Sequence, residues 1–292
     1  MAKGKNIAFI GLGVMGYPMA GHLASNGYNV TVFNRTKAKS EKWCAEFDGQ
    51  KGNTPKAVSS DADFIFCCVG NDDDLREVTY GETGIFSGVK PEAIIVDHTT
   101  TSALVARELN DKGKKLGIHF LDAPVSGGQA GAEQGTLTVM VGGEKTVFNK
   151  ASVPMNSYAQ AVTLMGESGS GQITKMVNQI CIAGLVQALA EGLNFAQRAG
   201  LNGERVVDVI SKGAAQSWQM ENRGNTMLCN EFDFGFAVDW MRKDLRICLD
   251  EGNRNGAYLP VTAIVDQFYK QVQEMGGGKA DTSSLMMLLK RS

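Results

Sequence analysis

A glycine-rich hexapeptide near the start of the chain has the spacing of a phosphate-binding turn. Gly11-Leu12-Gly13-Val14-Met15-Gly16 follows an apolar run, Asn6 to Ile10, that predicts a strand, and it leads into a predicted helix, Met15 to Asn26. In such a turn the first glycine permits the sharp bend, the second lets the backbone approach a pyrophosphate, and the third lets the helix pack closely on the strand. The hexapeptide in this setting predicts dinucleotide binding, although a purely structural glycine turn would have the same spacing.

The residues after the second predicted strand, Asn29 to Phe33, indicate which dinucleotide is bound. NAD-binding folds place Asp or Glu here to bind the ribose hydroxyls, and a carboxylate would repel a 2′-phosphate. This chain has Asn34-Arg35-Thr36 instead. A guanidinium can bind a phosphate through two hydrogen bonds and can stack on the adenine. We therefore expect NADP(H) to be preferred and NAD(H) to be possible; the alternative is that Arg35 is an ordinary solvated loop residue.

Three further loops follow predicted strands, where folds of this type bind their ligands. Val69-Gly70-Asn71-Asp72 and Asp97-His98-Thr99-Thr100 are candidates to contact the cofactor. An acidic turn and a helix cap are the alternatives for these two loops. In the third loop, Asp122 to Gly128, the hydroxyl of Ser126 and the unobstructed amides of Gly127 and Gly128 could hold a carboxylate. A plain Pro/Gly turn is the alternative there.

Lys175 and Asn178 are polar residues in an otherwise apolar, helical stretch. They are three residues apart, so they share one helix face. Hydride reduction of a carbonyl leaves a developing alkoxide that needs a proton, and a desolvated lysine can donate it and take it back in reverse. Asn178 could hold the substrate oxygen. A lysine that extends its ammonium group to solvent from a helix surface is the alternative.

Composition excludes several other classes of function. The chain has 292 residues and a formal net charge of −2, so no strongly basic field attracts nucleic acid or a membrane surface. The three histidines, His22, His98 and His119, have no metal-ligand spacing, so we expect no metal site. The six cysteines form no CxxC pair, and no run approaches the ~20 apolar residues of a membrane span. We expect a cytoplasmic protein.

These candidate residues require an α/β framework to bring them together. Strands alternating with helices in the first half predict a parallel, doubly wound sheet. The further predicted strands are Phe64 to Val69, Ala93 to Val96, His119 to Leu121 and Leu137 to Val141. Near residue 166 the pattern becomes helical, with a long helix over 171–199 and further helices over 203–212, 237–252 and 259–274. We therefore expect one domain over 1–166 and an all-helical domain over 167–292.

Four motifs in order give the chain a specific resemblance. It resembles the β-hydroxyacid dehydrogenase family, which includes 3-hydroxyisobutyrate dehydrogenase and the glyoxylate/succinic semialdehyde reductases. The match extends over nearly the whole chain. The motifs are Gly11 to Ala20, Asp122 to Gly128, Gly169-Ser170-Gly171 with Lys175-Met176-Val177-Asn178, and Lys243-Asp244-Leu245.

The resemblance implies roles for these residues. It implies a Rossmann-type N-terminal domain, Lys175 as the acid/base, Ser126, Gly127 and Gly128 as the carboxylate site, and Asn178 as the residue that orients the substrate. It further implies that Lys243 faces nicotinamide and substrate, and that Val69, Gly70, Asp74 and Thr100 line the cofactor groove. The partners implied are a small carboxylate substrate and further copies of the chain in a homodimer or homotetramer, formed through the helical domain.

The exact substrate stays open at this point. Asn178-Gln179 stands where 6-phosphogluconate dehydrogenases have a His-Asn pair, which argues against a phosphorylated sugar acid. A 3-hydroxyisobutyrate-type substrate is our best expectation, glyoxylate or succinic semialdehyde is the alternative, and an NADPH-binding sensor without catalysis is the alternative from another class. Trp218 and Trp240 could narrow a substrate pocket, although tryptophans more often belong to the core.

Overall fold

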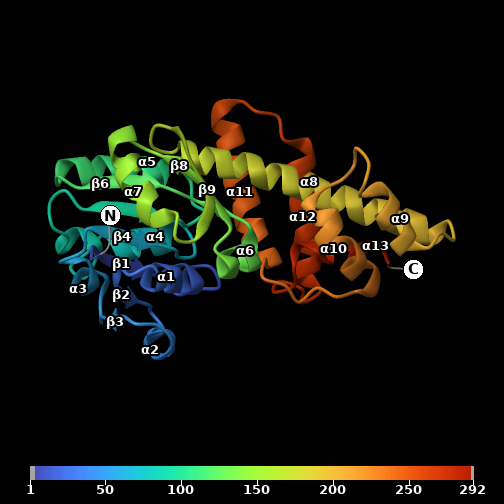
Figure 1. Cartoon of the computed structure of the whole chain (residues 1–292). Coiled ribbons are helices and arrows are strands. Elements are labelled where there is room, and N and C mark those ends of the chain that lie inside the picture. Colours follow the sequence, from blue (N-terminus) through green and yellow to red (C-terminus); the bar gives the residue numbers. More distant parts are fainter. Residues whose placement is uncertain (1–3, 291–292) are drawn as a thin grey trace. The chain divides into compact units, whose positions relative to one another are not determined.

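Two compact units make up the computed structural model, which describes residues 4–290. Unit 1 ends at Lys175 and unit 2 begins at Met176. The division falls within the long helix α8 (Ser170–Arg198), whose first residues belong to unit 1. The sequence places the domain boundary before this helix, at residue 166. Unit 1 is a sheet with helices, and unit 2 is helical (Figure 1).

The sheet of unit 1 has nine strands in the order β3-β2-β1-β4-β5-β6-β8-β7, with β9 paired to β8. The strands are β1 (Asn6–Ile10), β2 (Asn29–Phe33), β3 (Gln50–Lys51), β4 (Phe64–Cys67), β5 (Ile94–Asp97), β6 (His119–Asp122), β7 (Val125–Ser126), β8 (Leu137–Gly142) and β9 (Ala159–Gly166). The first six in this order are parallel and follow the doubly wound arrangement of dinucleotide-binding folds. The predicted fold class is confirmed.

The far edge of the sheet is mixed, whereas the sequence predicts a parallel sheet. β8 runs antiparallel to β6 and β7, and β9 runs parallel to β8. The connection from β7 to β8 is shorter than the roughly dozen residues that a parallel crossover needs. The chain therefore turns back through the short helix α6 (Gly128–Gln134).

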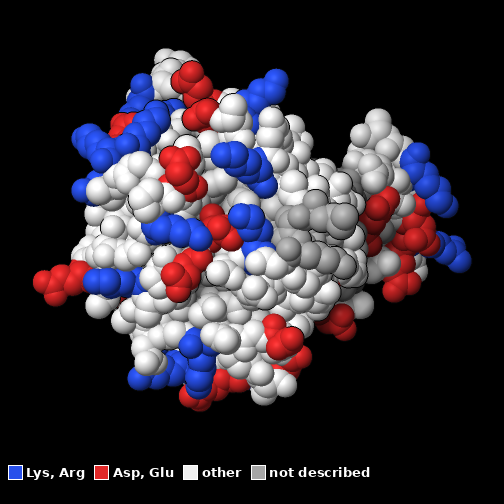
Figure 2. Space-filling view, turned by 60° about the vertical axis from the view of Figure 1, so that its left-hand side comes forward, with Lys and Arg blue, Asp and Glu red and all other residues white. Residues whose placement is uncertain are grey.

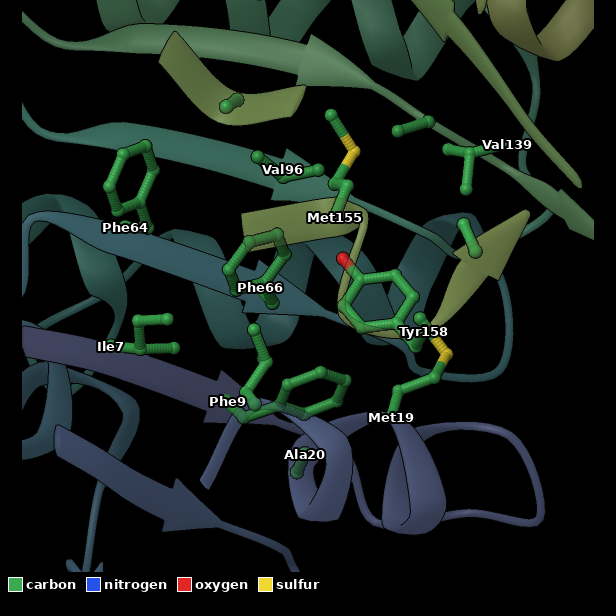
Figure 3. Packing of buried hydrophobic residues seen from close by; sticks show 14 of the residues in the cluster. Ile7, Phe9, Met19, Ala20, Phe64, Phe66, Val96, Val139, Met155 and Tyr158 are labelled. Carbon is green, nitrogen blue, oxygen red and sulfur yellow. The ribbon is translucent and has the colours of Figure 1, made fainter. Parts of the chain in front are cut away.

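Alternate residues of the central strands enter two hydrophobic clusters. Ile7 and Phe9 of β1 belong to one cluster, and Ala8 and Ile10 belong to the other. Successive side chains of a strand point to opposite faces, so both faces of β1 are buried, as its continuous apolar run predicts. Figure 3 shows the first cluster, where Phe66 of β4 lies among residues from several strands.

The remaining helices of unit 1 are α1 (Gly16–Ser25), α2 (Lys37–Glu46), α3 (Pro55–Ser59), α4 (Asp72–Thr79), α5 (Ala103–Lys115) and α7 (Lys145–Met155), with a 3-10 turn at Ile85–Ser87.

Unit 2 packs its helices around one face of α8. Ala183, Val186, Ala190 and Leu193 of α8 are buried in the core cluster of this unit. Val177, an apolar residue of the same helix, is exposed. The other helices are α9 (Gly203–Ile210), α10 (Trp218–Cys229), α11 (Val238–Asn255), α12 (Pro260–Glu274) and α13 (Met286–Leu289), with a 3-10 turn at Thr282–Leu285. The three predicted helices after α8 correspond to α9, α11 and α12.

Helix α8 is unusual in its length and composition. Its 29 residues span about 43 Å at ~1.5 Å per residue. Within residues 4–290 it is the single helix long and apolar enough to cross a membrane by these criteria, and 44% of its apolar window is buried inside the protein. A buried core helix meets the same criteria. That this protein has no membrane partner therefore stays a prediction.

Candidate active site

The loops predicted to bind ligands leave the sheet at one edge. Register aligns the carboxyl ends of β1, β2 and β4 at Ile10, Phe33 and Cys67. Backbone hydrogen bonds continue past these ends: the amide of Gly11 donates to Phe33, and the amide of Cys68 donates to Ile10. Parallel strands thus bring the glycine-rich turn and the loops after β2 and β4 together, as the doubly wound fold requires.

The glycine-rich turn has the shape that a pyrophosphate needs. Gly11 has φ +99°, and a Cβ there would lie 2.2 Å from the carbonyl oxygen of Cys68. A Cβ on Gly16 would lie 2.0 Å from the carbonyl oxygen of Gly11, so helix α1 could not start so close to β1 with a larger residue. A Cβ on Gly13 would meet nothing within 4 Å, so the space beside its Cα is open. The turn fits a dinucleotide.

Asn34 braces the glycine-rich turn from the end of β2. Its Oδ1 accepts a hydrogen bond from the amide of Leu12 at 2.9 Å, and its Nδ2 donates to the carbonyl of Thr36 at 3.1 Å. Thr36 itself is the N-cap residue of α2 and makes no side-chain capping bond. The Asn34 amide therefore uses both of its ends, and it ties the glycine-rich turn to the loop after β2.

Arg35 extends from the same loop into solvent, with its side chain 76% exposed. Its Nη1 lies 3.4 Å from Oδ1 of Asp74 and 3.6 Å from Oε2 of Glu77, both on α4. Exposed ion pairs of this kind contribute little to stability, about 0–1 kcal/mol. Little free energy is therefore lost when the guanidinium leaves these carboxylates to bind a more highly charged anion.

The loops after β4 and β5 are hydrogen-bonded to each other. The amide of Val69 donates to Oγ1 of Thr99 at 3.0 Å, and the amide of Thr99 donates to Oδ1 of Asp97. Gly70 and Thr100 are half-buried neighbours in these two loops. The structure thus brings Val69, Gly70 and Thr100 to the same edge as the glycine-rich turn, and Asp74 lies in the first turn of α4, the helix that follows the loop after β4.

The predicted carboxylate loop, Asp122 to Gly128, starts at the end of β6 and contains the short strand β7. Ser126 ends β7, which pairs with β8 through Ser126 and Thr138. Gly127 and Gly128 follow with φ +132° and +62°, conformations that favour glycine. A Cβ on Gly128 would meet nothing within 4 Å, so its backbone faces open space.

Lys175 lies in the second turn of α8 and is 8% exposed. Its burial excludes the alternative of a lysine extended along a helix surface into solvent. The helix start is capped by a residue distant in sequence: the carboxylate of Asp122 accepts from the amides of Gly169 at 2.7 Å and Gln172 at 3.0 Å. Burial raises the pKa of Asp122, and these hydrogen bonds partly offset the effect.

The buried side chain of His98 connects the loop after β5 to the residue that follows β6. Nδ1 of His98 donates to the carbonyl of Ala123 at 2.6 Å, which leaves Nε2 to accept from the hydroxyl of Tyr158 at 2.8 Å. The ring stacks on Phe66 with centroids 5.6 Å apart, and the Tyr158 ring meets Phe66 edge-on (Figure 3). Burial lowers the pKa of His98 to about 4.

This depressed pKa predicts a pH-dependent loss of stability. Below pH 6.5 His98 becomes protonated in the unfolded chain, whereas in the folded chain it stays neutral down to about pH 4. The free energy of unfolding should therefore fall from pH 6.5 to 4, by about 3 kcal/mol for this group. Urea unfolding of the wild type and of His98→Gln, which keeps a donor and an acceptor, measures the difference. Equal pH slopes in the two proteins would contradict the prediction.

In unit 2 the two predicted substrate residues belong to one hydrogen-bonded chain. Nδ2 of Asn178 donates to Oε1 of Gln179 at 2.8 Å, and Nε2 of Gln179 donates to Oδ2 of Asp244 at 2.6 Å. Nζ of Lys243 lies 3.2 Å from Oδ1 of the same carboxylate. Gln179 and Asp244 are buried, so they fix the side chains of Asn178 on α8 and Lys243 on α11.

The core interpretation of the two tryptophans is wrong. Trp218 is 52% exposed and Trp240 is 43% exposed. Trp218 lies over the guanidinium of Arg223, with 5.2 Å between the Arg223 Cζ and the ring centroid, and Trp240 has Nζ of Lys243 at 5.8 Å. Both rings therefore lie at the surface of unit 2, and each makes a cation–π contact with a basic side chain.

No cluster of three or more His, Cys, Asp or Glu side chains within residues 4–290 could hold a metal ion. Lys and Arg side chains are interspersed with Asp and Glu on the face drawn in Figure 2.

The sequence did not predict a role for three residues near the candidate site: Gln172, Gln179 and Asp244. Each is buried and hydrogen-bonded beside a predicted site residue. A signal was present for two of them, because Gln172 lies one helical turn before Lys175 and Asp244 directly follows Lys243.

Two family models match consecutive parts of the chain. Residues 6–166 match the NAD binding domain of 6-phosphogluconate dehydrogenase, and residues 169–289 match the NAD-binding domain of NADP-dependent 3-hydroxyisobutyrate dehydrogenase. Together they cover both units.

Relatives and solved structures agree with these models. An uncharacterised oxidoreductase of Shewanella frigidimarina is 60% identical over 100% of this chain and 99% of its own length. The 2-hydroxy-3-oxopropionate reductase of Escherichia coli K12 is 33% identical over 97% of this chain and 96% of its own length. A 3-hydroxyisobutyrate dehydrogenase of Mycobacterium tuberculosis, solved with L-serine, superposes with a TM-score of 0.90 at 26% identity, covering 98% of this chain and 99% of that one. The chain therefore belongs to the β-hydroxyacid dehydrogenase family and is an NAD(P)-dependent dehydrogenase that acts on a CH–OH group.

Proposed function

We propose that this enzyme interconverts a small β-hydroxy acid and its semialdehyde with NADP(H), and that its substrate is of the 3-hydroxyisobutyrate type. The observation that carries the proposal is the buried Lys175, which lies one helical turn after Gln172; the side chain of Gln172 is hydrogen-bonded to the loop after β5. A buried lysine at a ligand-binding edge suits proton transfer to a carbonyl oxygen.

The proposed roles follow from the chemistry of each group. When bound, the reduced nicotinamide supplies a hydride for the carbonyl carbon. Lys175 donates the proton that the resulting alkoxide needs and accepts it in the reverse direction. The hydroxyl of Ser126 and the amides of Gly127 and Gly128 hold the substrate carboxylate. Asn178 and Lys243 are the groups of unit 2 that we assign to substrate binding.

The cofactor preference rests on Arg35. The guanidinium is exposed and forms weak surface ion pairs with Asp74 and Glu77. A 2′-phosphate is a dianion that can take two hydrogen bonds from the same guanidinium, so it competes well for it. The Asn34 amide, which braces the turn, adds no negative charge beside that phosphate.

Replacing Arg35 by alanine should weaken NADPH binding and leave NADH binding nearly unchanged. Loss of a charge-assisted hydrogen bond of about 1.5–3 kcal/mol corresponds to roughly a tenfold to hundredfold rise in Kd. Fluorescence titration of both cofactors measures the effect, with Lys51→Ala, which removes an exposed ion pair to Glu41, as the control. A parallel loss of NADH affinity would assign Arg35 a general role in binding the dinucleotide.

We also propose a homodimer or homotetramer. Unit 2 exposes several large apolar side chains that a second copy of the chain could cover: Phe195, Leu201, Val209, Tyr258, Val261 and Ile264. Sedimentation or light scattering at several concentrations determines the assembly.

An initial-rate survey tests the proposed function. The wild type is assayed with NADPH and NADH against methylmalonate semialdehyde, tartronate semialdehyde, succinic semialdehyde and glyoxylate. The highest kcat/KM with methylmalonate semialdehyde and NADPH supports the proposal. Highest activity with glyoxylate or succinic semialdehyde favours the alternative, which is supported by the resemblance of the Asn34-Arg35-Thr36 loop to that of the NADP-using semialdehyde reductases. Binding of NADPH without turnover of any compound would favour a sensor.

A further inference from the structure

The start of helix α8 is tied to the end of β6 by a buried carboxylate. Asp122 is fully buried, its Oδ1 accepts from the amide of Gly169, and its Oδ2 accepts from the amide of Gln172. A carboxylate that caps a helix start also benefits from the positive end of the helix dipole. Asp122 is four positions before Ser126, so the strand end that leads to the carboxylate loop also holds the helix that carries Lys175.

The side chain of Gln172 ties the same helical turn to the loop after β5. Its Oε1 accepts from the amide of Thr101 at 3.0 Å, and its Nε2 donates to the carbonyl of Thr99 at 2.8 Å. Gln172 is fully buried. Oγ1 of Thr99 in turn accepts from the amide of Val69, so this bridge reaches the loops assigned to the cofactor.

The first turn of α8 is also packed tightly against the sheet. A Cβ on Gly171 would lie 2.4 Å from the carbonyl oxygen of Met140 and 2.6 Å from that of Asp122. A Cβ on Gly142 would lie 2.6 Å from Oδ1 of Asp122 and 2.8 Å from the amide nitrogen of Gly171. The turn therefore cannot slide along the sheet while these glycines stay in contact with it.

We propose that Gln172 and Asp122 are positioning residues for Lys175, which fix the lysine relative to both the cofactor loops and the carboxylate loop. Lys175 lies three residues after Gln172, so the place of its backbone follows from the hydrogen bonds of that turn. The inference rests on the proposed role of Lys175. Proton transfer requires the donor within hydrogen-bond reach of the substrate oxygen, and a misplacement of about 1 Å can reduce the rate about 100-fold.

A glutamine suits this position because the bridge needs one acceptor and one donor. The amide of Thr101 requires an acceptor, and the carbonyl of Thr99 requires a donor. Methionine has a similar volume and replaces neither bond. Glutamate keeps the acceptor, but its ionised carboxylate would face the carbonyl of Thr99; only its protonated form restores the donor.

The test is a double-mutant cycle between Gln172→Met and Lys175→Ala. We expect Gln172→Met to lower kcat about 100-fold, with a smaller change in the Kd for NADPH, and to add little once Lys175 has been removed. The kinetic isotope effect on kcat with deuterated NADPH should rise in the single variant, because the chemical step becomes limiting. Gln187→Met is the matched control, since Gln187 is a buried glutamine of α8 whose side chain donates to Glu191 in its own helix.

Outcomes separate this inference from the proposed function. If Lys175→Ala keeps full activity, the acid/base assignment fails. If Lys175→Ala is inactive but the two substitutions have independent, multiplicative effects, or Gln172→Met behaves like Gln187→Met, the positioning role is overturned. Should Gln172→Met fold poorly, Gln172→Glu provides the test: its kcat relative to the wild type should rise as the pH falls. A ratio that does not change with pH contradicts the inference.

Discussion

Replacement of Lys175 by alanine is expected to lower kcat about 10²–10⁴-fold while the enzyme still folds and binds NADPH. Transfer of a proton by a positioned side chain contributes a factor of this size. The side chain is 8% exposed, so solvent has little access to replace it as a proton donor. Steady-state kinetics with the best semialdehyde, normalised to the NADPH-binding sites, measures the loss.

Two further variants make this result specific. Lys175→Arg keeps the positive charge but has a group that does not deprotonate in proteins, so it should remain nearly inactive. Lys212→Ala removes an exposed lysine of the same type and should retain the wild-type rate. Full activity in Lys175→Arg would show that charge alone, and not proton transfer, is required.

The same substitution at two glycines of α8 should have opposite effects on stability. Gly171→Ala would place a Cβ 2.4 Å from the carbonyl oxygen of Met140, and the backbone must move to relieve this overlap. Overpacking of this kind costs about 1–3 kcal/mol or more. The displaced turn holds Lys175, so kcat should fall as well. At Gly192 a Cβ meets nothing within 4 Å, and Gly192→Ala should gain about 0.5–1 kcal/mol through the higher helix propensity of alanine.

Urea unfolding and kcat measured on both variants test this prediction. Gly192→Ala is the matched control because it changes the same atoms in the same helix. Equal stability of the two variants would show that the contact between α8 and the sheet is not tight in solution, and an unchanged kcat in Gly171→Ala would show that Lys175 does not depend on that contact.

Elements with a strong apolar pattern were predictable from the sequence, and elements without one were not. The strands β1, β4 and β5 are buried on both faces and have continuous apolar runs. β9 (Ala159–Gly166) was missed because it is largely exposed and contains polar residues. α10 was missed as well: Gly224 interrupts its pattern, yet a Cβ there would lie 3.1 Å from the side chain of Val207, so the glycine permits the packing of α10 on α9.

The candidate site was predictable only where its residues form local motifs. The glycine-rich turn has a spacing with a physical meaning, and its geometry follows that meaning. Lys175, by contrast, was raised above a surface lysine only by the resemblance to a family. The hydrogen bonds of Gln172 join residues 50 to 73 positions apart, and no spacing in the sequence indicates such a pairing.

Hydride transfer to a semialdehyde carbonyl should depend on the proton that Lys175 donates. The most direct test is NADPH that carries deuterium at the transferable position, incubated with methylmalonate semialdehyde and the wild type or Lys175→Ala. We predict a hydroxy acid with one deuterium on the carbinol carbon, formed by the wild type at least 100-fold faster than by the variant. A product without deuterium at that carbon, or equal rates in the two proteins, would contradict the account.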